Sequence, residues 1–271
     1  MREIKTHGFI LKKIPYQNEK TQLFSVMTSD FGKITLSAMQ SKRIQSSLRV
    51  LSPLNICEFE IYKSGNGYYK TRNVNLVHSL LDHKNGNQIN TLDIIQKLYV
   101  LAELIHITTE EEEPNNRLYT LLTKTAIIIQ ETNNELIFES FKTKLLDLSG
   151  NLPNLKYCLA CKKKCSNDAI WITEENLHLY CEECIPKETM EPCKQLSLDS
   201  LKLLHYIKDS GFINILRIES NDKALQMLRY LNDLLLTQIL QCALKTTQKS
   251  LVGINGFFVY HTPLPDFPTS T

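Results

Sequence analysis

The sequence predicts an α+β protein in which an N-terminal β-barrel precedes a helical bundle that a small cysteine-rich segment interrupts. Three observations lead to this fold class. Short β-rich runs fill the first 76 residues, the apolar period becomes helical from about Asn87, and two Cys-x-x-Cys pairs lie inside the helical part. With 271 residues, of which 42% are hydrophobic and 22% charged, the chain is long enough for two or three compact globular units.

The first 76 residues have the pattern of a small barrel. The strands are expected at Thr6–Lys12, Leu23–Thr28, Lys33–Ala38, Leu54–Tyr62 and Tyr68–Leu76. In the fourth run, Cys57, Phe59 and Ile61 fall on one side. Glu58 and Glu60 fall on the other, which is the alternation of a half-buried strand. Five short strands suit a Greek-key barrel such as the OB-fold, but an SH3-like barrel gives much the same pattern, so both stay open.

The rest of the chain is mostly helical. Helices are expected over residues 89–107, 116–130, 135–149, 197–209 and 222–244. Gly150 is a helix stop and Ser197 a helix cap. The acidic run Glu110–Glu113, followed by Pro114, ends the first helix and is interpreted as a solvated loop. The proline-rich end of the chain, within residues 251–271, is expected to be a loose tail.

The cysteines predict a metal site. Six of the eight lie between residues 158 and 193, and no export signal precedes them, which favours metal binding in a reducing compartment over disulfides. The pairs Cys158/Cys161 and Cys181/Cys184 have the spacing of two zinc knuckles. Residues 169–172 and 177–180 are expected to form the ribbon strands between them. Four thiolates leave no open position, so we expect one structural Zn(II) per chain. The remaining candidates for substitute ligands are Cys165, Cys193 and His178.

The charge is unevenly distributed along the chain. Residues 1–80 contain 12 Lys/Arg and 5 Asp/Glu, a net +7, whereas the remainder carries −5. A basic barrel suggests a polyanionic partner, and hydroxyl groups beside the cations suit a phosphate backbone. The candidate DNA-binding residues are Lys12, Lys13, Lys33, Lys42, Arg43, Arg49, Lys70 and Arg72. Tyr68 and Tyr69 are neighbours on one strand and point oppositely, so at most one can stack on a base.

Several classes of protein are excluded. No apolar run reaches 18 residues, so a membrane span is not expected, and the first residues lack the apolar core of a secretory signal. The sequence has no P-loop, G-x-S-x-G or H-E-x-x-H motif, and no histidine stands in the H-x-E pattern of a deaminase. These enzyme classes are therefore not expected, whereas the sequence does not exclude a nuclease built from scattered acids.

The order of these parts resembles the bacterial RecO family of recombination mediators. The residues that carry the resemblance are residues 7–16, Glu19, residues 23–28, Phe31-Gly32-Lys33, Lys42-Arg43, Ser46, Ser47, Leu48, residues 51–54, Phe141-Lys142, Leu145-Leu146, Leu148 and Gly150. They are spread over about residues 5–245. The sequence departs from the family pattern at Gln40, where a glycine is common, and at Cys165, an additional cysteine in the spacer.

The resemblance implies an OB-fold DNA-binding domain at residues 1–80, a helical domain at 81–155 and 188–250, and an inserted zinc ribbon with four cysteine ligands at 156–187. It also implies a cytoplasmic, nucleoid-associated binding protein without an active site of its own. Such a protein would bind single- and double-stranded DNA and anneal complementary strands. Its partners would be RecR, the acidic C-terminal tail of single-strand-binding protein, docked in the helical region, and indirectly the RecA filament. The alternative is a zinc-ribbon interaction protein that acts in transcription or on RNA.

Overall fold

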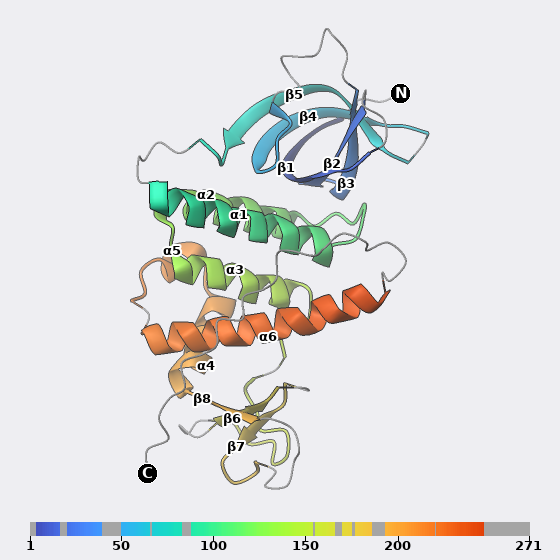
Figure 1. Ribbon diagram of the computed structural model, residues 1–271. Coiled ribbons are helices and arrows are strands. Elements are labelled where there is room, and N and C mark those ends of the chain that lie inside the picture. Colours follow the sequence, from blue (N-terminus) through green and yellow to red (C-terminus); the bar gives the residue numbers. More distant parts are fainter. Residues whose placement is uncertain are drawn as a thin grey trace.

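The computed structural model describes residues 4–16, 21–39, 50–65, 67–82, 88–153, 155–165, 170–174, 177–185, 193–219 and 221–246. Figure 1 shows an elongated molecule with a β-barrel at one end, helices in the middle and a small sheet at the other end. The tail at residues 251–271 lies outside the described residues.

The barrel has the OB-fold strand order. Its strands are β1 (Ile4–Ile14), β2 (Thr21–Thr28), β3 (Gly32–Met39), β4 (Asn55–Lys63) and β5 (Tyr69–Ser79). They close in the order β1-β2-β3-β5-β4, with β1 antiparallel to β4. β3 and β5 pair in parallel through Leu36↔Tyr69 and Ser37↔Lys70. The predicted OB-fold is therefore confirmed, and each expected strand is present.

Alternation along the strands fills the barrel. Cys57, Phe59 and Ile61 are buried, as the sequence pattern predicts, and belong to a compact core inside the barrel. A second core cluster is continuous from the barrel to the helices and the small sheet. It includes Phe9 and Leu11 of β1, which face the helices. Burial of this apolar surface holds the parts of the molecule together.

The helices lie in layers beneath the barrel (Figure 1). They are α1 (Gln88–Thr108), α2 (Asn116–Thr132), α3 (Glu135–Leu148), α4 (Leu198–Asp209), α5 (Phe212–Ile215) and α6 (Asp222–Thr246). Asn115, Asn134 and Ser197 accept backbone N–H bonds as N-caps of α2, α3 and α4. Beyond α3, Gly150 has φ +72°, and the N–H of Asn151 bonds to the carbonyl of Leu146, which confirms the predicted stop.

The small sheet has one strand more than the sequence predicts. β6 (Ile170–Thr173) and β7 (Leu179–Cys181) are the expected ribbon strands. A third strand, β8 (Cys193–Leu196), pairs with the other edge of β6 and leads into α4. The four-residue helix α5 was also not predicted.

The acidic run between α1 and α2 is an exposed loop, as predicted, and it is in addition docked on the barrel. Its side chains are exposed, but the N–H of Glu112 donates to the carbonyl of Lys33 at 2.8 Å. Lys63 Nζ lies 2.5 Å from Glu112 Oε2. The backbone of Glu113 packs against Gly32. These contacts tie the first helical connection to the edge of β3.

Among the described residues, no helix is long and apolar enough to cross a membrane.

Candidate metal centre and nucleic-acid surface

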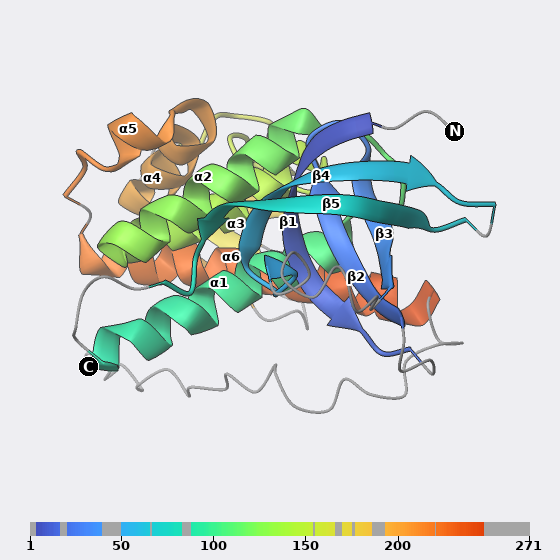
Figure 2. The ribbon, with the colours of Figure 1, turned by 90° about the horizontal axis from the view of Figure 1, so that it is seen from above.

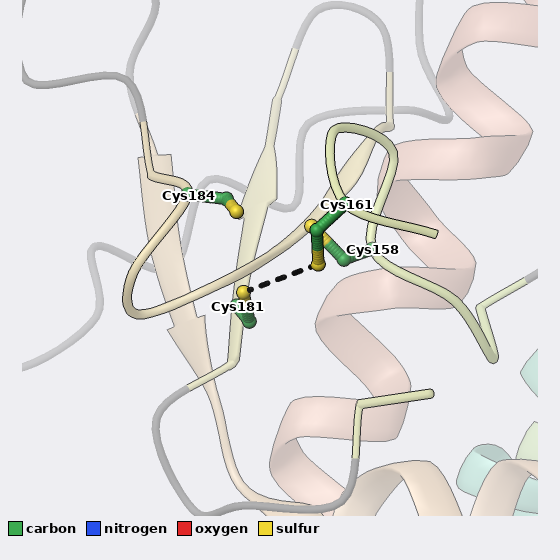
Figure 3. A group of neighbouring side chains, drawn as sticks. All are labelled: Cys158, Cys161, Cys181 and Cys184. Atoms are coloured by element: carbon green, nitrogen blue, oxygen red, sulfur yellow. Dashed lines mark hydrogen bonds between the residues drawn. The ribbon is translucent and has the colours of Figure 1, made fainter. Parts of the chain in front are cut away.

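Four cysteine sulfurs converge beside β7. The sulfurs of Cys158, Cys161, Cys181 and Cys184 all lie within 4.8 Å of one another (Figure 3). The Sγ atoms of Cys161 and Cys181 are 3.8 Å apart. Tetrahedral zinc with bonds of about 2.3 Å places its sulfurs about 3.8 Å apart, so the spacing fits a metal and is too long for a disulfide. The two predicted knuckles are therefore brought together.

The first knuckle is shaped by backbone hydrogen bonds. The N–H of Cys158 donates to the carbonyl of Lys163, and the N–H of Lys162 donates back to the carbonyl of Cys158. Lys162 has φ +59°, which closes the turn. Lys162, Lys163 and Lys164 are exposed around this turn.

The electrostatics of the cluster favour a bound cation. Burial opposes ionisation of Cys158, but N–H groups of Cys161, Cys181 and Ala160 outweigh it and lower the Cys158 pKa to about 6. A hydrogen bond with Cys181, together with burial, raises the pKa of Cys184 to about 12. One thiolate thus forms readily, whereas its neighbours resist ionisation beside it. A divalent metal removes that repulsion, so the donor set fits a structural metal ion.

The other candidate ligands are not in this group. Among the described residues the metal-ligand cluster contains only the four knuckle cysteines. Burial and the nearby cysteines raise the pKa of Cys165 to about 11, and its N–H donates to the carbonyl of Lys156. Cys193 pairs with Thr173 at the far edge of β6. His178 is exposed, and its N–H donates to Thr173 Oγ1.

The ribbon is attached to α6. The hydroxyl of Tyr230 donates to a carboxylate oxygen of Glu174, and Gln238 Nε2 donates to the Glu174 carbonyl at 3.0 Å. Lys194 Nζ lies 3.9 Å from the centre of the Tyr230 ring. Ile172 and Leu179 belong to the same core as the helices. The metal centre is therefore coupled to the helical body through both apolar and polar contacts.

Four of the predicted DNA-binding cations are on the barrel surface. Lys12 and Lys13 are exposed near the end of β1. Partial burial of the Lys12 ammonium lowers its pKa. Arg72 is exposed and Lys70 half-buried at the start of β5. Lys42, Arg43, Arg49 and the departure at Gln40 lie outside the described residues.

Lys33 has a different position from the one predicted. It is 7% exposed, and its ammonium donates to the carbonyl of His106 at 2.8 Å and to that of Thr109. Burial lowers its pKa, although Glu111 Oε1 lies 3.9 Å away. Lys33 thus satisfies carbonyls at the end of α1, where a cation is favourable. This position does not match the prediction that it contacts DNA, so Lys33 is left out of the surface proposed below.

A groove on the helical body was not found from the sequence. It has a volume of about 800 Å³ and lies among α2, α3, α4 and α5. Its apolar lining includes Ile128, Phe212 and Ile213, and Ile213 is 71% exposed. Its cationic residues are Arg117, Lys124, Lys144 and Lys208. Lys144 donates to the Ser210 carbonyl and Lys208 pairs with Asp147, so the groove combines an apolar floor with a largely basic rim.

An OB-fold barrel with surface cations, a helical body and a four-cysteine ribbon that could hold a metal ion are features typical of nucleic-acid-binding proteins. Comparison with known proteins narrows this class. The family model described as recombination protein O C terminal matches residues 97–248, and that described as recombination protein O N terminal matches residues 1–80. The chain belongs to the RecO family, which confirms the resemblance found in the sequence.

Individual relatives agree with the family match. A DNA repair protein RecO of Alkaliphilus metalliredigens is 27% identical over 225 residues, covering 80% of this chain and 86% of the relative. One of Caldicellulosiruptor bescii is 27% identical, covering 70% and 76%. A third, of Dehalococcoides mccartyi, is 25% identical, covering 83% and 86%.

Proposed function

We propose that the protein is a DNA-binding recombination mediator without an active site, acting in DNA repair at the nucleoid of the bacterial cytoplasm. It binds single- and double-stranded DNA, anneals complementary strands, and helps to load RecA together with RecR and single-strand-binding protein. The observation that carries the proposal is the OB-fold barrel with outward cations in a member of the RecO family. Family membership favours this function over a zinc-ribbon protein of transcription or RNA.

Annealing requires little chemistry from the protein. Two complementary strands repel through their phosphates, and base pairing itself is favourable once they meet. The barrel cations Lys12, Lys13, Lys70 and Arg72, with Lys42, Arg43 and Arg49 from the sequence, would neutralise phosphates and raise the local concentration of both strands. Such contacts are independent of base sequence.

We further propose that the thiolate cluster holds one Zn(II) per chain. Bound zinc would link the two knuckles and supply folding energy. Cys158, Cys161, Cys181 and Cys184 are its ligands in this proposal, and the ribbon would stabilise α6 through Tyr230 and Gln238.

The groove on the helical body suits the acidic C-terminal tail of single-strand-binding protein. Arg117 and Lys124 on its rim complement acidic side chains, while Phe212 and Ile213 offer apolar contact to the end of a peptide. The charge and the apolar floor together support this occupant.

Annealing of two complementary oligonucleotides, naked and coated with single-strand-binding protein, tests the function. We expect the protein to accelerate annealing of both. Lys124→Glu should slow annealing of coated strands only, because it alters the groove and not the barrel. Lys202→Glu is the matched control, since Lys202 is exposed on α4 and does not line the groove. Absence of acceleration by the folded wild-type protein on either substrate would contradict the proposed function.

A further inference from the structure

The hairpin of β4 and β5 presents a surface on the side of the barrel away from the helices. β1 and β2 make the main contacts with α1 and α2. β5 meets α2 at its C-terminal end, where His78 Nε2 lies 2.6 Å from Gln130 Oε1. In Figures 1 and 2 the start of β5 and the end of β4 extend away from the helical layers. This part of the barrel is therefore open to a long ligand that the helical body does not block.

A β-bulge places an arginine on a tyrosine at this surface. Glu60 pairs with Asn73 and Ile61 pairs with Thr71, so Arg72 is the additional residue of β5. Its guanidinium carbon lies 5.2 Å from the centre of the Tyr62 ring. Bulges re-aim side chains, and this one sets a planar cation over an outward-facing aromatic ring.

The neighbouring residues add a second cation and a second aromatic ring to this surface. Lys70 is directly opposite Tyr62 in the strand register. Tyr68 precedes β5 and is 38% exposed, whereas Tyr69 is buried against Phe31 with ring centres 5.8 Å apart. Of the two adjacent tyrosines, Tyr68 is thus the one whose ring is accessible to a ligand.

The acidic side chains of this face are already engaged. Lys5 Nζ lies 3.2 Å from Glu60 Oε1. Asn75 Nδ2 donates to Glu58 Oε2 at 3.3 Å. Their charges are partly offset within the protein, so they oppose a polyanion less than unpaired carboxylates would.

We infer that Tyr62, Arg72 and Tyr68 form a stacking platform for unpaired bases, and that Lys70 contacts the adjoining phosphates. The platform gives the barrel a preference for single strands over duplexes, because bases in a duplex are stacked on each other and are not available. Aromatic rings and guanidinium planes stack on any base, so the contact does not select a sequence. This inference rests on the proposed function and specifies the form of nucleic acid that the barrel takes.

An abasic strand separates stacking from phosphate contact. Fluorescence anisotropy would compare an oligothymidine with an abasic strand of equal length and equal phosphate number, at one salt concentration. We expect wild-type protein to bind the oligothymidine about tenfold more tightly. Tyr62→Leu should abolish most of this ratio. Arg72→Lys, which keeps the charge and removes the planar group, should reduce it while leaving affinity for the abasic strand nearly unchanged.

Tyr157→Leu is the matched control, because Tyr157 is 49% exposed, pairs with Lys164 beside the first knuckle and belongs to none of the barrel strands. It should leave the ratio at the wild-type value. Equal affinity of wild-type protein for the two strands would overturn the stacking platform while leaving a phosphate-binding barrel intact. So would a ratio that neither Tyr62→Leu nor Arg72→Lys changes. A folded wild-type protein that binds neither strand would overturn the proposed function itself.

Discussion

Gly32 of the barrel lies against the backbone of the acidic loop. It has φ +68°, and a Cβ built on it would lie 1.9 Å from the carbonyl oxygen of Glu113. Gly32→Ala therefore combines left-handed backbone strain with a clash against backbone that is itself held by Lys33. We expect it to lower the free energy of unfolding by about 3 kcal/mol, measured by urea denaturation.

Gly67→Ala separates the two effects. Gly67 has φ +82°, but a Cβ there would meet nothing within 4 Å. Only the backbone strain remains, so the expected loss is about 1 kcal/mol. Equal losses in the two variants would show that the contact of Gly32 with the acidic loop does not contribute to stability.

His106 of α1 contacts Ser25 of the barrel, and we expect the stability of this contact to fall at acidic pH. Burial, with Lys12 and Lys33 nearby, lowers its pKa from 6.5 to about 4, and Ser25 Oγ lies 2.9 Å from its Nδ1. Between about pH 4 and pH 6.5, His106 is therefore protonated in the unfolded chain but neutral in the folded protein. The unfolded state then binds more protons, so the free energy of unfolding falls as the pH falls, by at most about 3 kcal/mol.

His106→Gln isolates this contribution, because glutamine does not titrate and retains hydrogen-bonding groups for Ser25. Urea denaturation of both proteins from about pH 7 to about pH 4 should show a smaller loss of stability in the variant. Parallel pH profiles for the two proteins would contradict the assignment of this acid sensitivity to His106.

Lys33 shows where residue-level prediction from the sequence ends. The inward positions of Cys57, Phe59 and Ile61 were predictable because alternation in a strand is local. Lys33 lies between the buried residues Gly32 and Ile34, where strand alternation predicts an outward side chain. The carbonyls that bind its ammonium nevertheless belong to residues more than 70 positions later in the chain. No pattern within a strand contains that information.

The ribbon is the element whose stability should depend on the proposed zinc. Its strands share a core with the helices, and the chain's single tryptophan, Trp171, lies in β6. Removal of the metal with a strong chelator should therefore change Trp171 fluorescence and lower the melting temperature of the whole protein. Elemental analysis before chelation should find about one zinc per chain.

Cys181→Ser combined with Cys184→Ser should reproduce the effect of chelation without added chelator. Cys193→Ser is the control, because Cys193 lies outside the thiolate cluster and pairs on the far edge of β6. A metal-free protein with wild-type Trp171 fluorescence and melting temperature would contradict a structural role for the site.

Among the helices and strands, those that a local sequence pattern determines could be predicted. The long helices, the barrel strands and the spacing of the knuckles follow from periodicity and helix-end signals, as Ser197 and Gly150 illustrate. β8 was missed because its four residues, Cys193–Leu196, become a strand only by pairing with β6. The helical groove was missed for the same reason, since Lys124 and Phe212 meet only in the folded bundle.

For the whole molecule, the basic and acidic parts of the sequence lie at different ends of the structure. Residues 1–80 carry +7 and contain the barrel strands at one end of the molecule. The remainder carries −5 and contains the helices and the ribbon (Figure 1). A polyanion approaching such a molecule is attracted to the barrel end and repelled elsewhere. The position of a charge, and not only the net charge of +2, should therefore determine DNA affinity.

Two double variants with the same change in net charge test this argument. Lys42→Glu with Arg43→Glu alters the predicted basic loop of the barrel, and Lys202→Glu with Lys223→Glu alters exposed positions on α4 and α6. Each phosphate contact on single-stranded DNA contributes about −0.7 to the slope of log affinity against log salt. Loss of two contacts should therefore reduce that slope by about 1.4 and weaken binding most at low salt, whereas the helical variant should keep the wild-type slope. If the two variants weaken binding equally, net charge alone governs association, and the basic loop is not part of the DNA surface.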